Sequence, residues 1–341
     1  MSVLGFPSNS LPTGWFIVSW SHDLPVGEVK ALEYFGEKLV LWRGESGEAF
    51  LQDAFCLHLG AHRGVGGFVK GDDITCPWHG WQWNGEGRNT VIPYGDDGCK
   101  PKLQVRSYPT REWCGSVLAW YEPNGGEPTW EPPVIENYGN PAWFDMHPFS
   151  SKVHRIRAHP QMPIENAVDP AHIPLIHGAA EVPRILSTTA DKHHFRSEVE
   201  VLYGGGRQAT AITPDGPIHS SVDMNTYGIG LSMVYWEQPM IPTVQLTGFT
   251  PIDNDHIDYW FAQSSIRADG EIGDEPTGAA LKMLKVQWKV IEQDFFIWEN
   301  MKYLDRPSFA SLESKHYASM RRWATQFYPE ADRAAMVPVG D

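Results

Sequence analysis

Short runs of hydrophobic residues, each bounded by turn-forming residues, follow one another over the first third of the chain. Three of these runs, rich in aromatic and β-branched residues, are residues 15–18, 38–42 and 116–120. Gly, Pro and Asp separate the runs, and residues 44–48 (Gly-Glu-Ser-Gly-Glu) fit a hairpin turn between two of them. The pattern predicts an all-β domain over residues 14–123.

A stretch rich in proline and glycine follows this domain. Residues 122–128 (Glu-Pro-Asn-Gly-Gly-Glu-Pro) and the pair Pro132-Pro133 form the clearest change in composition, as linkers between domains do. A chain of 341 residues also exceeds what a single hydrophobic core usually serves. We therefore predict a second domain over residues 134–330.

The second domain is predicted to open with a strand over residues 152–158 and a helical stretch over residues 165–177. From about residue 195 to 267 hydrophobic and polar residues alternate one by one in several runs, which is typical of half-buried antiparallel strands. From about residue 276 to 303 the hydrophobic period lengthens to three or four residues, which predicts one long helix packed on that sheet. Its hydrophobic positions are Leu281, Leu284, Trp288, Ile291, Phe295 and Trp298. The predicted fold class is α+β.

Composition and charge exclude several classes of partner. The chain has 42% hydrophobic residues and a net charge of −15, so it would repel nucleic-acid phosphates and anionic membranes. No apolar run approaches the roughly 20 residues needed to span a bilayer. The first residues also lack the basic and apolar segments of a secretory signal. We expect a cytoplasmic protein without a membrane span.

The four cysteines point to metal binding rather than to disulfides. A large cytoplasmic chain does not need disulfides, and regularly spaced thiols there more often bind metal. Cys99 and Cys114 have no histidine or cysteine at chelating spacing, so we interpret them as bystanders. Cys56 and Cys76 each have such a neighbour.

The strongest motif is Cys56-Leu57-His58, then 17 intervening residues, then Cys76-Pro77-Trp78-His79. Each half supplies one thiolate and one imidazole. In a Rieske [2Fe–2S] centre two cysteines hold one iron and two histidines hold the other. Because imidazoles are neutral, such a cluster carries less negative charge and has a higher reduction potential than an all-cysteine cluster. The motif predicts a one-electron carrier.

Structural zinc is the alternative for the same residues. Zinc fingers, however, usually place two cysteines in one half of the site and two histidines in the other, whereas each half is mixed here. Gly60 and Gly80 follow the two halves and would let backbone amides approach the sulfurs. His62, four residues after His58, is interpreted as a loop histidine.

A second motif lies at residues 165–177 (Glu-Asn-Ala-Val-Asp-Pro-Ala-His-Ile-Pro-Leu-Ile-His). His172 and His177 are five residues apart, so in a straight helix they would lie roughly 140° apart around the axis. They can reach one metal only if the helix ends or bends between them, and we expect Pro174 to supply the break. The two histidines then need a carboxylate to complete the facial triad of a non-haem iron site.

Asp294 is the candidate carboxylate. It lies three residues after Ile291 and four before Trp298, so it shares the hydrophobic face of the long helix, whereas Glu292 points elsewhere. A buried carboxylate without a partner is costly, and a metal is a natural partner. Asp169 precedes His172 by three residues and could accept a hydrogen bond from its imidazole. Asp169 and Asn166 are the candidate catalytic residues of this segment.

Together, the two motifs resemble those of the Rieske-type aromatic-ring-hydroxylating oxygenases over nearly the whole chain. The resemblance implies an all-β Rieske domain followed by a catalytic domain of the helix-grip fold, and a set of metal ligands. The cluster ligands would be Cys56, His58, Cys76 and His79, and the Fe(II) ligands His172, His177 and Asp294. Asp169 matches the acid that joins a cluster histidine of one subunit, here His79, to an iron-bound histidine of its neighbour. The resemblance thus implies a homo-oligomer, often a trimer.

Within that family the sequence is similar to the oxygenase components of 3-ketosteroid 9α-hydroxylases. The similarity is carried by residues 35–40, 71–79, 292–298 and 321–328. It implies a monooxygenase that uses O₂ to hydroxylate a bulky, apolar, steroid-like substrate. Its electrons would come from NADH through a separate flavin-containing reductase, with or without a ferredoxin.

Other functions remain open at this point. The same kind of site can dihydroxylate an arene, or demethylate or desaturate a smaller substrate. A non-catalytic electron carrier, which the iron motif disfavours, and a structural zinc protein are further alternatives. Four aromatic residues could line an apolar pocket, although packing in the core is the commoner role for each: Tyr227, Trp236, Trp260 and Phe261.

Overall fold

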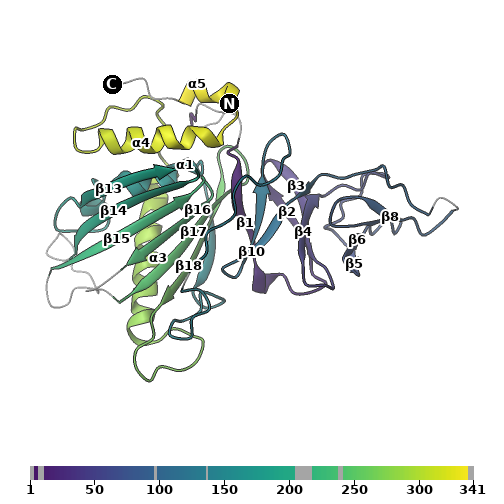
Figure 1. Ribbon diagram of the computed structural model, residues 1–341, viewed down its shortest axis with the longest axis horizontal. Coiled ribbons are helices and arrows are strands. Elements are labelled where there is room, and N and C mark those ends of the chain that lie inside the picture. The colour runs from purple at the N-terminus through teal and green to yellow at the C-terminus, as the bar shows by residue number, and fades with distance from the viewer. Residues whose placement is uncertain are drawn as a thin grey trace. The chain divides into compact units, whose positions relative to one another are not determined.

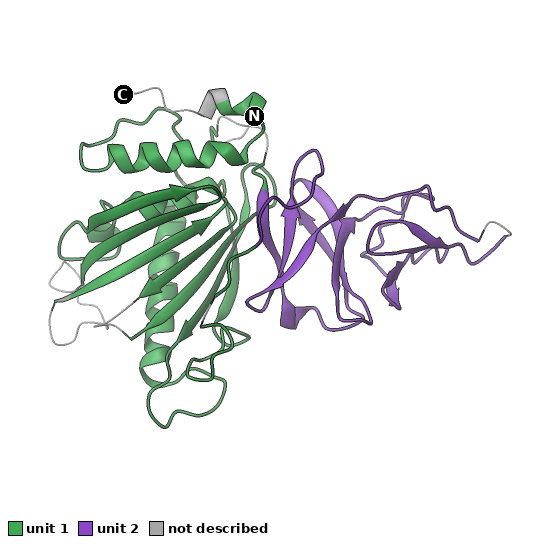
Figure 2. Ribbon diagram, in the orientation of Figure 1, with its two compact units in different colours: residues 1–13, 132–341 green, residues 14–131 purple. Residues whose placement is uncertain are grey.

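The computed structural model describes residues 4–6, 11–95, 98–135, 137–203, 217–236 and 241–336. The chain forms two compact units, coloured separately in Figure 2. The N-terminal unit is Gly14–Glu131, and the C-terminal unit combines Met1–Thr13 with Pro132–Asp341. None of the helices in the described ranges is both long enough and apolar enough to cross a membrane.

The N-terminal unit is built from small antiparallel sheets (Figure 1), with strand orders β1-β11-β10, β2-β3-β4-β9 and β5-β6-β7-β8. Its elements are β1 (Gly14–Trp20), η1 (Ser21–Asp23), β2 (Val29–Tyr34), β3 (Glu37–Arg43), β4 (Ala49–Asp53), β5 (Phe68–Lys70), β6 (Asp73–Thr75), β7 (Gln82–Trp83), β8 (Asn89–Val91), β9 (Ser107–Tyr108), β10 (Thr110–Trp113) and β11 (Ser116–Tyr121). The three hydrophobic runs lie in β1, β3 and β11. The expected hairpin joins β3 to β4, and the Gly44 amide donates to the Glu48 carbonyl at 2.9 Å.

The C-terminal unit has a seven-stranded antiparallel sheet of order β12-β18-β17-β16-β15-β14-β13, crossed on one face by the long helix α3 (Figure 1). The strands are β12 (Ser151–Ile156), β13 (Arg184–Asp191), β14 (His194–Tyr203), β15 (Ile218–Tyr227), β16 (Leu231–Trp236), β17 (Thr243–Pro251) and β18 (Ile257–Ser265). The helices are α1 (Gln161–Glu165), η2 (Asn166–Val168), α2 (Ile173–Ile176), α3 (Gly278–Trp298), α4 (Ser314–Ala324), η3 (Thr325–Phe327) and α5 (Glu330–Met336).

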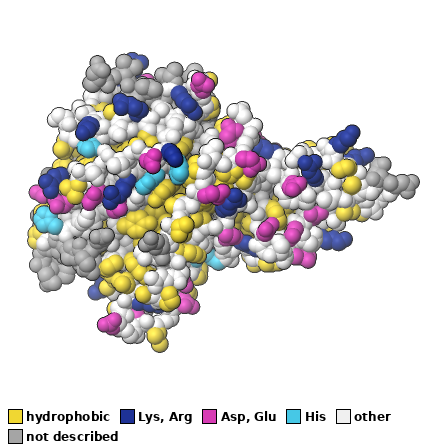
Figure 3. Space-filling model, viewed as in Figure 1, with side chains coloured by type: hydrophobic (Ala, Val, Ile, Leu, Met, Phe, Trp, Pro, Cys, Tyr) yellow, Lys and Arg dark blue, Asp and Glu magenta, His cyan; other side chains and the backbone are white. Residues whose placement is uncertain are grey.

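The core of the C-terminal unit lies between the sheet and its helices. The hydrophobic face of α3 buries Trp288, Ile291 and Phe295, as its spacing predicts. Phe261 of β18 packs against Trp288, and Tyr259 packs against Phe295. Hydrophobic side chains are also visible over the middle of this unit in the view of Figure 3.

The helical stretch predicted over residues 165–177 is wrong in detail, because the structure breaks it into short turns. The break falls at Asp169, whose φ of −110° and ψ of 80° leave the helical region, and Pro170 follows it. Pro174 does not break a helix; it lies in the first turn of the four-residue helix α2, where proline's fixed φ is tolerated. His172 and His177 are the residues that cap α2 at its two ends.

Candidate metal centres

Two loops of the N-terminal unit hold the cysteine and histidine pairs in the same way. In the first loop the Gly60 amide donates to the Cys56 carbonyl at 2.9 Å, and in the second the Gly80 amide donates to the Cys76 carbonyl at 3.0 Å. Gly60 has φ +77° and Gly80 has φ +71°, a left-handed conformation that favours glycine. Each glycine therefore closes a tight turn around one cysteine.

The two loops bring all four predicted cluster ligands together. Cys56 and Cys76 are buried and interact directly with each other. The imidazole rings of His58 and His79 lie 4.6 Å apart, and His58 stacks on Trp81 at 4.5 Å. Nδ1 of His58 is buried without a hydrogen-bond partner, which is costly unless a bound group fills that role. The donor set and this orphaned nitrogen fit a [2Fe–2S] cluster held by two cysteines and two histidines.

A buried arginine balances the charge of these cysteines. Arg63 is fully buried, and its guanidinium donates to the side chain of Gln52 at 2.8 Å and to the Asp53 carbonyl. Burial lowers the pKa of Arg63 to about 10, while the nearby Cys56 and Cys76 act in the opposite direction. Burial raises the pKa of the Cys56 thiol, and the neighbouring Cys76 adds to this effect. An anionic cluster is therefore accompanied by a fixed positive charge.

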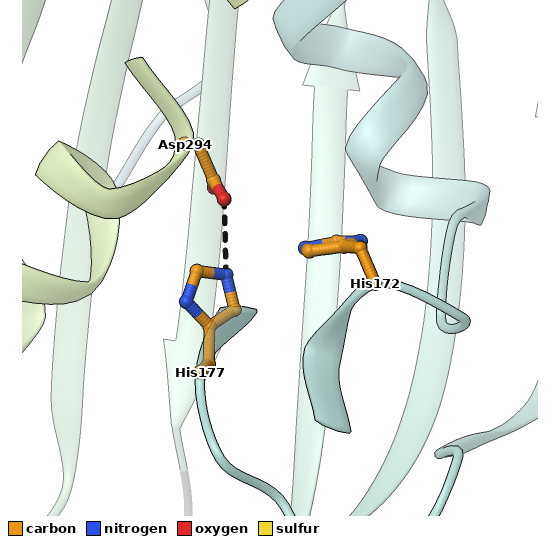
Figure 4. Close-up of side chains that lie close together, drawn as sticks. All are labelled: His172, His177 and Asp294. Carbon is orange, nitrogen blue, oxygen red and sulfur yellow. Dashed lines mark ion pairs between the residues drawn. The ribbon is translucent and has the colours of Figure 1, made fainter. Parts of the chain in front are cut away.

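His172, His177 and Asp294 converge in the C-terminal unit. One potential ligand atom from each residue lies within 4.8 Å of the other two, as Figure 4 shows. Nε2 of His177 lies 3.2 Å from Oδ1 of Asp294. The short helix α2 supplies both histidines and the middle of α3 supplies Asp294, which is only 8% exposed. Two imidazoles and one carboxylate are the donor set of a non-haem iron site.

Each of these three side chains is oriented by a neighbour. Nδ1 of His172 lies 3.4 Å from Oδ2 of Asp169, and Nδ1 of His177 lies 3.2 Å from Oε1 of Gln293. Each neighbour presents an acceptor oxygen to Nδ1, which favours the tautomer whose Nε2 lone pair is available for a metal. The Asn166 amide donates to Oδ2 of Asp294 at 3.1 Å.

The carboxylates also set the charge around His172. Burial alone would lower the pKa of His172, but Asp169 and Asp294 together raise it above its usual range. Burial would raise the pKa of Asp169, yet hydrogen bonds from His172 and from Tyr317 of α4 hold it below its usual range. Asp169 is thus an ionised acceptor between a histidine and a tyrosine.

An apolar cavity of about 170 Å³ opens directly beside the triad, between the sheet and α3. Asn166, His172, His177 and Asp294 line it together with apolar side chains from five strands and from α3. A second cavity of about 450 Å³ is lined by His172, Asp294 and Asp169. His172 and Asp294 can therefore be reached from two sides, whereas His177 lines only the apolar one of these two cavities.

Most of the remaining candidate residues lie away from the apolar cavity. Trp236 lines the apolar cavity, but Tyr227, Trp260 and Phe261 do not. Tyr227 stacks on His194, and the Trp260 indole donates to Thr250. Glu292 is exposed, as its helical phase predicts.

The bystander interpretation of Cys114 agrees with its surroundings, because burial raises the pKa of its thiol to about 12. Cys99 is half-buried, and the imidazole of His62 accepts a hydrogen bond from the Gly64 amide of its own loop. Gln293 is a site residue that sequence reasoning missed. Its position next to Asp294 was the available signal, but a glutamine on a long helix carries no motif of its own.

Comparison with known proteins agrees with this geometry. Residues 14–109 match the family model of the Rieske [2Fe–2S] domain, and residues 119–328 match that of the 3-ketosteroid 9alpha-hydroxylase C-terminal domain. The chain is 29% identical to a 3-ketosteroid-9-alpha-monooxygenase oxygenase component from Rhodococcus rhodochrous, over 94% of this chain and 82% of that protein. It is 30% identical to a cholesterol 7-desaturase from Xenopus laevis, over 93% of this chain and 72% of that protein.

The fold also matches a solved structure. The chain aligns with dicamba monooxygenase bound to 3,6-dichlorosalicylic acid with a TM-score of 0.72, over 95% of this chain and 98% of that one, at 16% identity. The predicted α+β fold, with an all-β Rieske domain followed by a sheet that grips a long helix, is confirmed. The chain belongs to the family of Rieske oxygenases that join a Rieske [2Fe–2S] domain to a 3-ketosteroid 9alpha-hydroxylase C-terminal domain.

Proposed function

We propose that this chain is the oxygenase component of a multicomponent monooxygenase that hydroxylates a bulky, apolar, steroid-like substrate with O₂. The observation that carries the proposal is the apolar cavity whose wall includes His172, His177 and Asp294. A substrate in that cavity would lie against the site at which oxygen is activated. Two families of steroid-modifying relatives, the 9-alpha-monooxygenases and the cholesterol 7-desaturases, support a steroid-like substrate.

In this proposal the chain's own residues hold the metals and control access to them. Cys56, His58, Cys76 and His79 would hold the cluster, and His172, His177 and Asp294 the iron. When bound, these two groups supply one-electron transfer and the activation of O₂. Gln293 and Asp169 would favour a proton on Nδ1 of each histidine and so leave Nε2 free for the metal, and Asn166 orients the Asp294 carboxylate. Apolar side chains from the sheet and α3 exclude water from the substrate's side of the site.

We further propose that the protein is a homotrimer in which electrons pass from the cluster of one subunit to the iron site of its neighbour. Apolar side chains are exposed around the cluster histidines, namely Leu57, Leu59 and Trp78, and around Asp169, namely Leu175, Met301 and Leu304. Exposed apolar groups of this size mark interaction surfaces when they gather around a functional group. His79 of one subunit would then approach Asp169 of the next.

The substitution Trp78→Asp tests the trimer. It should give monomers in sedimentation experiments and slow electron transfer to the iron site, while the cluster spectrum and the iron content stay unchanged. Ile272→Asp, the same kind of change at an exposed apolar residue that belongs to neither surface, is the matched control. Trimers that persist in Trp78→Asp with full activity would contradict the proposed surface.

The electron donor is proposed to be a separate NADH-dependent flavin reductase, acting directly or through a ferredoxin. The function is tested by incubating the purified holoprotein with a surrogate reductase, NADH and a panel of 3-ketosteroids, and by measuring the product mass. We expect a gain of one oxygen atom, and no product from Asp294→Ala. Conversion of small aromatics but of no steroid in the panel would refute the steroid assignment.

The size of the cavity favours one alternative. A cavity of 150 Å³ in another protein binds benzene, so a space of about 170 Å³ accepts a ring-sized group as it stands. A four-ring substrate would require side chains to move apart. Demethylation, desaturation or ring dihydroxylation of a smaller substrate is therefore the second candidate, and the same panel extended to single-ring compounds distinguishes it.

A further inference from the structure

The apolar cavity contains two glutamine side chains that no step of the proposed function uses. Gln245 of β17 and Gln287 of α3 line it, opposite one another across the space between sheet and helix. Most of the remaining wall is apolar, with Val234 and Val290 among its residues, and Thr226, Ser232 and Thr247 add hydroxyl groups. Two carboxamides in such surroundings require an explanation.

Both glutamines are buried, and neither side chain is paired within the described part of the chain. Gln245 is 5% exposed and Gln287 is 4% exposed, and neither makes a side-chain hydrogen bond there. Thr226, another residue of the cavity wall, is fully buried, and its hydroxyl also lacks a partner. A buried amide without a partner is destabilising, and a hydrogen bond to a polar group of a ligand would offset that cost.

The register of the elements places both glutamines away from the triad. Gln287 precedes Asp294 by seven residues, two helical turns or roughly 10.5 Å along α3. On the strand side, Phe249 pairs with Tyr259, whose ring lies 6.0 Å from the ring of Trp298, a residue four positions after Asp294 in α3. Phe249 therefore lies at the triad end of the cavity. Gln245 lies four residues before Phe249 in β17, away from that end.

The chemistry of a carboxamide limits what these residues can recognise. Its NH₂ group donates to a carbonyl oxygen, and its Oε1 accepts from a hydroxyl group. Since neither glutamine is charged, the subsite suits a neutral oxygen rather than a carboxylate or an amine. A site built to hydrogen-bond such a group discriminates against an analogue that lacks it, because the site's own polar atoms are then left unpaired.

We propose that Gln245 and Gln287 form a recognition subsite for a ketone or hydroxyl oxygen, carried at the end of an apolar substrate remote from the reacting carbon. The proposal rests on the proposed function and sharpens it. It assigns a role to two residues at the far end of the cavity, and it requires a substrate whose oxygen lies at the end remote from the carbon that reacts.

The test uses the holoprotein and pairs of compounds that differ only in the oxygen. One pair is a 3-ketosteroid and its 3-deoxy analogue, and the other is the bicyclic 2-decalone and decalin. Dissociation constants are measured by calorimetry for both pairs. The variants are Gln245→Met and Gln287→Met, which keep side-chain length and remove the amide. Met224→Leu, an apolar change in the same cavity wall, is the matched control.

The wild type should bind a ketone about tenfold or more tightly than the matching hydrocarbon, as one net hydrogen bond predicts. Each glutamine variant should lower this ratio toward one by weakening ketone binding alone, and Met224→Leu should keep it. Cluster absorption and melting temperature check that each variant is folded. A wild type without a preference for ketones, or glutamine variants that keep it, would overturn the proposal.

The two compound pairs separate this inference from the steroid assignment. Preference for decalone with no binding of either steroid would reject the steroid substrate and support the subsite. Steroid and deoxysteroid converted equally well would support the proposed function and overturn the subsite.

Discussion

The two proposed metal centres of this chain are built in opposite ways. In the N-terminal unit, two loops of nearly identical geometry each supply a cysteine and a histidine within four residues of one another. In the C-terminal unit, the ligands come from two segments more than a hundred residues apart, the short helix α2 and the long helix α3. The first centre depends on local turns, and the second depends on how a helix packs on a sheet.

The difference extends to how the ligands are held. The cluster loops are closed by backbone hydrogen bonds and by glycines in left-handed conformations. The proposed iron ligands are held by side chains, because Asp169, Gln293 and Asn166 each contact one of them. A single side-chain substitution should therefore weaken the iron site without disturbing the cluster, and this asymmetry can be measured.

The largest expected effect comes from removing one ligand at each centre. Asp294→Ala should lose the mononuclear iron and all product formation while keeping the visible spectrum and the inorganic sulfide of the cluster. Cys76→Ala should lose the sulfide and the spectrum. Metal and sulfide analysis with turnover assays checks both. A fully active Asp294→Ala protein would show that the carboxylate is not a ligand.

Loss of a supporting side chain should have an intermediate effect. Gln293→Met removes the acceptor for Nδ1 of His177, and loss of such partners typically lowers metal affinity or activity by about 10- to 100-fold. Iron affinity, measured by competition with a chelator, should fall by this factor, and the cluster spectrum should not change. Glu292→Gln, at the exposed neighbouring position, is the control. Equal iron affinities in the two variants would show that Gln293 does not support iron binding.

A smaller effect is expected at the cluster. Arg63→Met removes a buried positive charge next to Cys56 and Cys76. The reduced, more negative cluster loses more stabilisation than the oxidised one, so the midpoint potential should fall by roughly tens of millivolts. Arg63→Lys keeps the charge and should keep most of the potential. A potential that is the same in Arg63→Met and the wild type would show that this arginine is structural only.

The smallest effect concerns stability at mildly acidic pH. His159 is fully buried beneath Phe6 at a ring distance of 3.5 Å, and burial lowers its pKa to about 3. Because the unfolded chain takes up the proton near pH 6.5, the stability that depends on neutral His159 is complete above that pH and is lost as the pH falls toward 3.

At pH 5 the expected loss is about 2 kcal/mol relative to pH 7.5. The melting temperature of His159→Gln should therefore fall less between these two pH values than that of the wild type, with the exposed His219→Gln as the control. Parallel pH profiles for wild type and His159→Gln would contradict this assignment.

Several features of this protein can be predicted from short stretches of its sequence. The Cys-x-His and Cys-x-x-His pairs identify the cluster site because each pair is contained in one turn, whose geometry depends on nearby residues alone. The alternation in the sheet strands and the three-to-four period of α3 indicate the fold class for the same reason. The hydrophobic phase of α3 also distinguishes Asp294, which is buried, from Glu292, which is exposed.

Other features were decided only by tertiary packing. The contact of Gln293 with His177 and the placement of Gln245 and Gln287 in one cavity each depend on segments distant in the chain. Of four candidate pocket aromatics, only Trp236 lines the cavity. The position of the cavity depends on how α3 packs on the sheet, so the alternation within one strand does not show which of its residues will line it. Local sequence determines turns and periods, whereas the partners of a side chain across a sheet or helix are set by the folded chain as a whole.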